Sequence, residues 1–419
     1  MRHYIALSVA ISLFLVPWLA VNYPDKADLI VAEIRSIGSQ LAAVVLHNPR
    51  TVAQLQEKYN SQNKSSQQNK IKVVIVPGHE PNFGGTEYGD IKERDLVVGI
   101  ADNLARFLQE SGKYEVVVTR SQAAWNPVFD AYFKNSEKAI VEWQKDYKAE
   151  SVQQISMGLP LPPPKVYHNN APPGVANRLY GITKWSNENA VDVAIHIHLN
   201  DYPGHGQRVA GKYSGFSIYT PEEQYFNSKS TRAVSESIFK RLQRYNPVSD
   251  LPGESDGIVP ERELIAIGAN NTADAASLLI EYGYIYEPQF VNPDARDLAL
   301  KDLAYQTYLG LEDFFNPNGL KNLAITYDTL MLPYTWKETL SPNSKNIADI
   351  YALQTALSFE RVYPPANRSK NDCPRTGRIG PCTEQAIKDF QKKNGLEITG
   401  IVGPQTLEVL NRIYSGRVM

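Results

Sequence analysis

The sequence predicts an α/β fold class: a mostly parallel, twisted sheet flanked by helices, followed by a small all-α domain of three helices. Short apolar, β-branched runs alternate with amphipathic helical segments between residues 71 and 316, a pattern typical of a parallel sheet. Residues 346–416 carry helical spacing alone. In addition, a chain of 419 residues is too long for one ordinary domain, so we expect two domains plus additional segments.

The elements of the larger domain can be predicted in order. Four runs rich in Val and Ile are predicted to be buried strands, and they span residues 71–76, 114–119, 191–200 and 276–283. Three segments with apolar residues at three- and four-residue spacing are predicted to be helices, and they span residues 93–111, 228–245 and 294–315. Residues 121–177 interrupt the alternation with aromatic residues and a proline run. We interpret them as an insertion that is either a lid over the cleft or a packed decoration.

The N-terminal segment indicates the cellular compartment in which the folded domains lie. Residues 1–24 combine a short basic start with an uncharged apolar run, so they are either a signal peptide or a retained membrane anchor. The end of the run offers no good pair of small residues for cleavage, which favours the anchor. Residues 25–70 are expected to form an amphipathic helix and a polar linker. The folded domains are therefore expected outside the cytoplasm, in the periplasm or facing the cell wall.

The net charge and the cysteines indicate what the protein binds and whether it contains a disulfide. The net charge is −2 and the pI is about 6.4, which argues against a nucleic-acid binder because such proteins usually carry a basic footprint. The two cysteines, Cys373 and Cys382, lie in one Pro/Gly-rich loop. In an exported chain we expect them to form a disulfide, the alternative being two free thiols.

Polar residues that carry chemistry lie on or directly after predicted strands, except for one, Glu93, at the start of a predicted helix. They are His79, Glu93, His196, His198, Asn200 and Glu281. Alternate residues of a strand share a face, so His196, His198 and Asn200 point away from the apolar side of their strand. Two His and one carboxylate with an open fourth position are the ligand set of catalytic zinc, and a second carboxylate beside it serves as a general base. From spacing alone, structural roles for the same residues stay open.

The local sequences that hold these residues occur in a fixed order. They read VIVPGHE (74–80), KERDL (92–96), VVVTR (116–120), HIHLN (196–200) and LIEYGY (279–284). In this order and spacing they resemble the zinc-dependent N-acetylmuramoyl-L-alanine amidases across residues 71–316. The resemblance implies one Zn²⁺ held by His79, Glu93 and His198, with Glu281 as the catalytic base. It also implies hydrolysis of the amide between N-acetylmuramic acid and L-alanine in peptidoglycan, for wall remodelling or lysis.

Three departures from that family's pattern stand out. Val76 replaces an Asp, residues 80–83 are inserted before the Gly-Gly pair, and His196 replaces a Ser. We interpret His196, together with Asn200, as support for the metal ligands or as a substrate contact; for His196 the role of a rival ligand is also open. Two other functions stay open: a zinc carboxypeptidase acting on wall peptides, and an inactive wall-binding protein.

The segment 346–416 resembles a different family. Its matching residues are Leu353, Gln354, Thr383, Ala386, Ile387, Phe390, Gln391, Gly400, Gly403 and Thr406. This pattern is similar to the small three-helix peptidoglycan-binding domains, which implies peptidoglycan as a partner. Residues 317–345 are expected to be the linker before it. A membrane contact is expected only through an uncleaved N-terminus, and the sequence identifies no regulatory partner.

Overall fold

The computed structural model describes residues 49–62, 69–146, 171–202, 206–223, 225–262, 264–267, 274–317 and 327–416. The predicted signal or anchor and the amphipathic helix after it lie outside these residues. The chain divides into two compact units, Met1–Pro49 and Arg50–Met419, and every element below belongs to the second. No helix within the described ranges is long and apolar enough to cross a membrane.

A six-stranded sheet forms the centre of the catalytic part, with strand order β4-β1-β5-β8-β6-β7. The strands are β1 (Ile71–Pro77), β4 (Tyr114–Val118), β5 (Val193–Asn200), β6 (Ser217–Pro221), β7 (Ile258–Glu261) and β8 (Ala276–Tyr284). All neighbours are parallel except β6 and β8, which are antiparallel. The prediction of a mostly parallel sheet is therefore confirmed, with β6 and β7 as strands that the sequence pattern did not predict.

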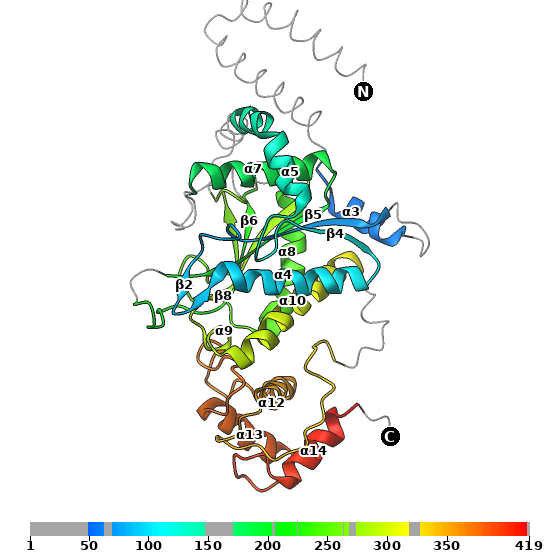
Figure 1. Cartoon of the computed structure of the whole chain (residues 1–419). Coiled ribbons are helices and arrows are strands. Elements are labelled where there is room, and N and C mark those ends of the chain that lie inside the picture. Colours follow the sequence, from blue (N-terminus) through cyan, green and yellow to red (C-terminus); the bar gives the residue numbers. More distant parts are fainter. Residues whose placement is uncertain are drawn as a thin grey trace, which may run out of the picture. The chain divides into compact units, whose positions relative to one another are not determined.

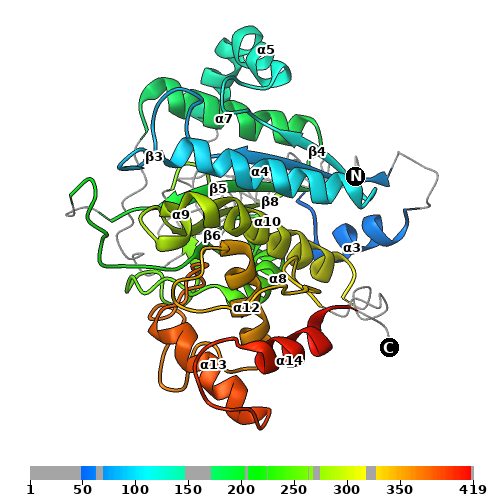
Figure 2. The same ribbon diagram turned by 60° about the horizontal axis from the view of Figure 1, so that its bottom comes forward.

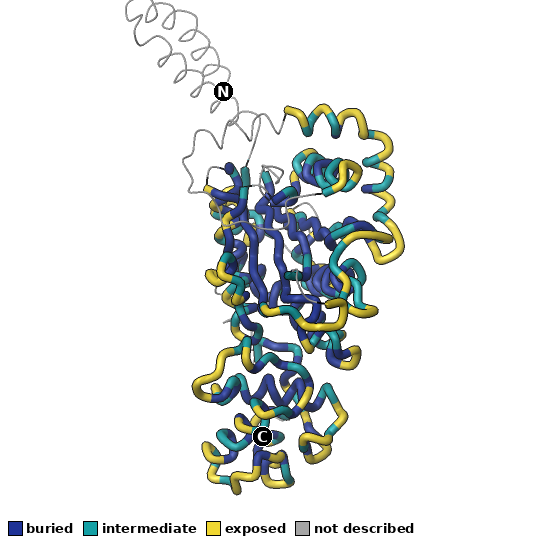
Figure 3. The backbone as a smooth tube through the Cα atoms, turned by 90° about the vertical axis from the view of Figure 1, so that its left-hand side faces the viewer, coloured by how far each residue is buried: buried dark blue, intermediate teal, exposed yellow. Residues whose placement is uncertain are grey.

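Helices cover both faces of this sheet (Figure 1). One face carries α4 (Glu93–Glu110), α8 (Ser228–Tyr245) and α10 (Pro293–Phe315), and the other carries α5 (Pro127–Asn135) and α7 (Pro173–Glu188). Alternation along β1 explains the two layers: Val73 and Ile75 pack into the first core, whereas Val74 and Val76 pack with Phe129 into the second. Figure 3 shows the strands as the most continuously buried part of this domain.

The insertion 121–177 supplies most of the second layer. It contains α5, a helix at residues 137–146 and the start of α7, while residues 147–170 lie outside the described ranges. The side chain of Phe129 in α5 is fully buried beneath this layer. Helix α5 therefore packs against the sheet through Phe129, whereas Ile140 of the helix at residues 137–146 packs against Tyr180 of α7.

A short helix before the sheet belongs to the same unit. Helix α3 (Val52–Asn60) buries Leu55 and Tyr59 in the main core, and Lys58 forms an ion pair with the fully buried Asp192 at the start of β5. Helix α3 thus lies within residues 25–70, which were expected to form an amphipathic helix and a polar linker, and it belongs to the compact unit that begins at Arg50.

The C-terminal domain contains the three expected helices (Figure 2), which are α12 (Ile347–Phe359), α13 (Pro381–Lys393) and α14 (Pro404–Tyr414). Part of the expected linker joins their core: Trp336 is 1 % exposed, and Leu340 forms a β-bridge with Val402. The predicted disulfide between Cys373 and Cys382 is confirmed, with Cα atoms 5.8 Å apart.

Two family-matching glutamines in this domain act inside it. Gln354 donates from Nε2 to Thr383 and accepts from the backbone of Gly377. Gln391 donates to Thr406 and accepts from the backbone of Gly400. Both side chains are 1 % exposed, so these positions specify the fold of the domain.

Candidate active site

The loop after β1 presents His79 to the cleft. His79 has a positive φ of 67°, a conformation that is uncommon for a non-glycine residue and clusters at functional sites. Gly78 before it lies directly against His198, because a Cβ on Gly78 would come within 2.4 Å of the His198 ring. A glycine is therefore required at position 78 by the close approach of these two elements.

Arg120, at the end of the VVVTR run, holds the same loop in place through hydrogen bonds to its backbone. Its guanidinium is 2 % exposed and donates to the carbonyl oxygens of Pro77, at 3.1 Å, and Gly78. It also donates to the carbonyl oxygen of Arg94 in the first turn of α4. Burial lowers the pKa of Arg120 to about 10, against the opposing effect of the nearby Glu80. Arg120 therefore ties the loop that presents His79 to the helix that presents Glu93.

Glu93 lies between two histidines. Its Oε2 is 2.9 Å from Nε2 of His79, and its Oε1 is 3.1 Å from Nδ1 of His198. The backbone N–H groups of Thr86 and Leu199 donate to the two oxygens. Burial alone would raise the pKa of Glu93, but the charge of His79, the hydrogen bond with His198 and the close contact with His79 outweigh it and hold the pKa well below its usual value.

The donor atoms of His79, Glu93 and His198 all lie within 4.8 Å of one another. In a tetrahedral zinc site with bonds of about 2.0–2.1 Å, donor atoms are separated by roughly 3.4 Å. Nε2 of His79 is buried and close to the Glu93 carboxylate, yet it makes no well-aligned hydrogen bond to any group in the described ranges. That geometry suits donor atoms of His79, Glu93 and His198 that all point towards one position, where a metal ion could bind. Two imidazoles and one carboxylate therefore fit a catalytic zinc ion.

Glu281 faces this cluster from the neighbouring strand. It pairs in register with His198 across β5 and β8, and its side chain lines the same cavity. The residue is 3 % exposed, and its Oε2 has no hydrogen-bond partner within the described part of the chain. Burial, reinforced by the charges of Glu93 and Glu254, raises the pKa of Glu281 well above its usual value.

The two other predicted residues of β5 differ in position. His196 lines the cavity and is 3 % exposed, and burial, with a smaller effect of His198, lowers its pKa to about 3. Asn200 lies past an irregularity in the β5–β8 register and does not line the cavity. Its amide donates to the buried Glu254 at 2.8 Å, so Asn200 belongs to a network behind the catalytic face.

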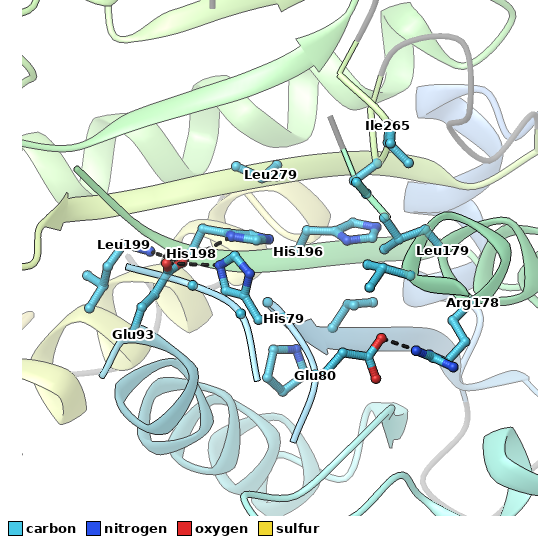
Figure 4. Close-up of a pocket in the computed structure, with 18 of the residues that line it drawn as sticks. His79, Glu80, Glu93, Arg178, Leu179, His196, His198, Leu199, Ile265 and Leu279 are labelled. Atoms are coloured by element: carbon cyan, nitrogen blue, oxygen red, sulfur yellow. Dashed lines mark hydrogen bonds and ion pairs between the residues drawn. The ribbon is translucent and has the colours of Figure 1, made fainter. Parts of the chain in front are cut away.

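The far wall of the cavity holds residues that sequence reasoning missed (Figure 4). The cavity has a volume of about 450 Å³, and Glu80, Trp125 and Arg178 line it together with the residues above. Arg178 in α7 donates from Nε to Oε1 of Glu80 at 2.7 Å, and Trp125 donates to Oε2 at 3.1 Å. Glu80 belongs to the inserted residues 80–83, which were the available signal. The insertion 121–177 thus contributes to the wall of the cavity.

Comparison with known proteins identifies the family of the chain. A family model described as N-acetylmuramoyl-L-alanine amidase matches residues 73–312, more than half of the chain. The chain therefore belongs to the N-acetylmuramoyl-L-alanine amidase family. A second model, described as a peptidoglycan binding domain, matches residues 346–410. No curated protein matches the chain.

Solved structures similar to the chain include several amidases. The N-acetylmuramoyl-L-alanine amidase from Clostridium difficile 630 is 20 % identical with a TM-score of 0.36, and the match covers 60 % of this chain and 100 % of that one. The N-acetylmuramyl-L-alanine amidase from Mycobacterium smegmatis is 14 % identical with a TM-score of 0.39, covering 59 % of this chain and 97 % of that one. The CwlD amidase from Clostridioides difficile, in complex with the GerS lipoprotein, is also 14 % identical with a TM-score of 0.39, covering 59 % and 100 %.

Proposed function

We propose that this protein is a zinc-dependent hydrolase of the amide bond between N-acetylmuramic acid and L-alanine in peptidoglycan. The observation that carries the proposal is the convergence of His79, Glu93 and His198 beside the buried, partly unpartnered carboxylate of Glu281. Membership of the amidase family, over residues 73–312, supports the choice of this amide as the substrate.

In this proposal His79, Glu93 and His198 hold the metal. Zinc, when bound, supplies polarisation of the scissile carbonyl and lowers the pKa of a water molecule from 15.7 towards about 7. Arg120 and Gly78 keep the ligands in place, because they fix the loop backbone and let it approach His198 closely. His196 supports the ligands from the same face of β5 without binding the metal.

Glu281 moves the proton. Its Oε2, which has no protein partner in the described ranges, accepts a proton from the attacking water and returns it to the nitrogen of the leaving L-alanine. The burial of Glu281 suits this exchange, since a carboxyl with a raised pKa can hold a proton between the two steps. One carboxylate thus serves as base and then as acid.

The C-terminal domain is proposed to hold the enzyme on the wall. A domain that binds insoluble peptidoglycan raises the local substrate concentration without adding a catalytic group. The N-terminal 24 residues are proposed to direct export of the chain, either as a signal peptide that is removed or as a membrane anchor that is retained. In both cases the enzyme works in the periplasm or facing the cell wall.

Mass spectrometry of purified muropeptides after incubation with the zinc-loaded protein tests the proposal. An amidase releases an intact stem peptide that begins with L-alanine, leaving the sugar with a free lactyl carboxylate. Release of a single C-terminal amino acid would identify a carboxypeptidase. An unchanged muropeptide would identify a wall-binding protein without activity.

A further inference from the structure

We propose that Arg178 binds a carboxylate of the stem peptide and so selects anionic peptide substrates. The inference rests on the proposed function, because it concerns the same cavity. In Figure 4 Arg178 and Glu80 form a separate pair from the cluster of His79, Glu93 and His198. All five residues line one cavity, so a substrate bound at the cluster can extend to the arginine.

Glu80 positions the guanidinium of Arg178. Its side chain is 5 % exposed, and each carboxylate oxygen accepts one hydrogen bond, from Nε of Arg178 and Nε1 of Trp125. Because Glu80 engages only Nε, the two terminal nitrogens of Arg178 are left for another acceptor. Glu80 is its only ion-pair partner in the described part of the chain, and the arginine side chain is 31 % exposed.

The Nη2 atom of Arg178 lies at a corner of the cavity beside the first turn of α7. A Cβ built on Gly174 would lie 3.8 Å from Nη2 of Arg178. Gly174 is in the first turn of α7, a helix of 16 residues whose N-cap, Pro172, makes no side-chain cap. The positive end of the helix dipole therefore adds to the charge of the guanidinium at this point.

The charge of the substrate decides which group this corner receives. The acyl side of the scissile bond is the uncharged lactyl carbonyl of the sugar, whereas the peptide side carries carboxylates. A guanidinium with two terminal nitrogens matches a carboxylate in a bidentate pair. Arg178 is the only Lys or Arg among the described residues that line the cavity. The peptide, rather than the glycan, is therefore expected on the side of α7.

Two zinc-loaded muropeptide assays on the full chain test the inference. The substrates differ only in whether their stem-peptide carboxylates are free or amidated. The wild type is expected to favour the free form, and Arg178→Gln to lower kcat/KM for that form by about tenfold, through KM, with little change for the amidated form. Arg178→Lys should retain part of the preference, because the ammonium keeps the charge but loses the planar fork.

The control is Arg232→Gln, which removes a half-exposed arginine of α8 that pairs with Glu236 and should change neither rate. Calorimetric binding of the free stem peptide gives a readout independent of turnover. Weaker binding of the peptide to Arg178→Gln than to wild type supports the inference, whether or not the protein cleaves an amide. Absence of cleavage would contradict the proposed function but not this inference. Equal binding by both proteins, or equal losses on both substrates, overturns the inference.

Discussion

The contact between the catalytic part and the C-terminal domain includes one fully buried ion pair. Nη2 of Arg375 lies 2.6 Å from Oδ2 of Asp302 in α10, and the two side chains are 2 % and 1 % exposed. The guanidinium packs between the rings of Tyr245 and Tyr351, with centroids at 4.8 and 4.9 Å, and Nη1 donates to Thr355. Asp302→Ala therefore strands a cation in a site closed to water, which costs about 3–5 kcal/mol.

Urea unfolding of the full chain measures this cost. The matched control is Glu384→Ala, which breaks the half-exposed pair with Lys388 on α13 and should cost about 1 kcal/mol or less. The double variant Asp302→Leu/Arg375→Met should recover most of the loss, because apolar side chains of similar volume replace the pair. A cost for Asp302→Ala no larger than that of the control would refute the burial of this pair and, with it, the close contact of the two domains.

Three further predictions concern the disulfide and the supports of the active site. Replacing Cys373 and Cys382 by Ser should lower the free energy of unfolding by roughly 2.5 kcal/mol; an unchanged denaturation midpoint, with and without reductant, would contradict this. Arg120→Lys should weaken zinc affinity by about 10- to 100-fold, because it loosens the loop that carries His79. Competition with a chelator measures this affinity, and an unchanged value would show that Arg120 does not hold the loop in place. His196→Ser should keep bound zinc and most turnover, whereas loss of the metal would make His196 a ligand.

The parts of the fold that the sequence predicted are those specified locally. Strands β1, β5 and β8 are mostly apolar along their length, as expected of strands that are buried on both faces. Strands β6 and β7 each contain a proline and span few residues, and proline argues against a strand in any pattern analysis. The antiparallel pairing of β6 with β8 depends on contacts between distant segments, which periodicity does not report.

The residues of the candidate site also fall into two groups, those that the sequence predicted and those that it did not. His79, Glu93, His198 and Glu281 lie in short motifs whose order resembles a known family, so sequence reasoning could name them. The pairing of Glu80 with Arg178 joins residues far apart in the chain. No local pattern links an inserted loop to a helix at the end of another insertion.

The central claim, that three residues hold zinc and a fourth transfers the proton, is tested most directly by measuring zinc content and turnover on the same purified variants. His79→Ala and His198→Ala should lose the metal, because two remaining ligands hold it poorly. Glu281→Gln should keep stoichiometric zinc and the fold but lose turnover of the muramoyl–L-alanine amide by roughly 10² to 10⁴. Full activity in Glu281→Gln, or retained zinc in His198→Ala, would contradict the assignment.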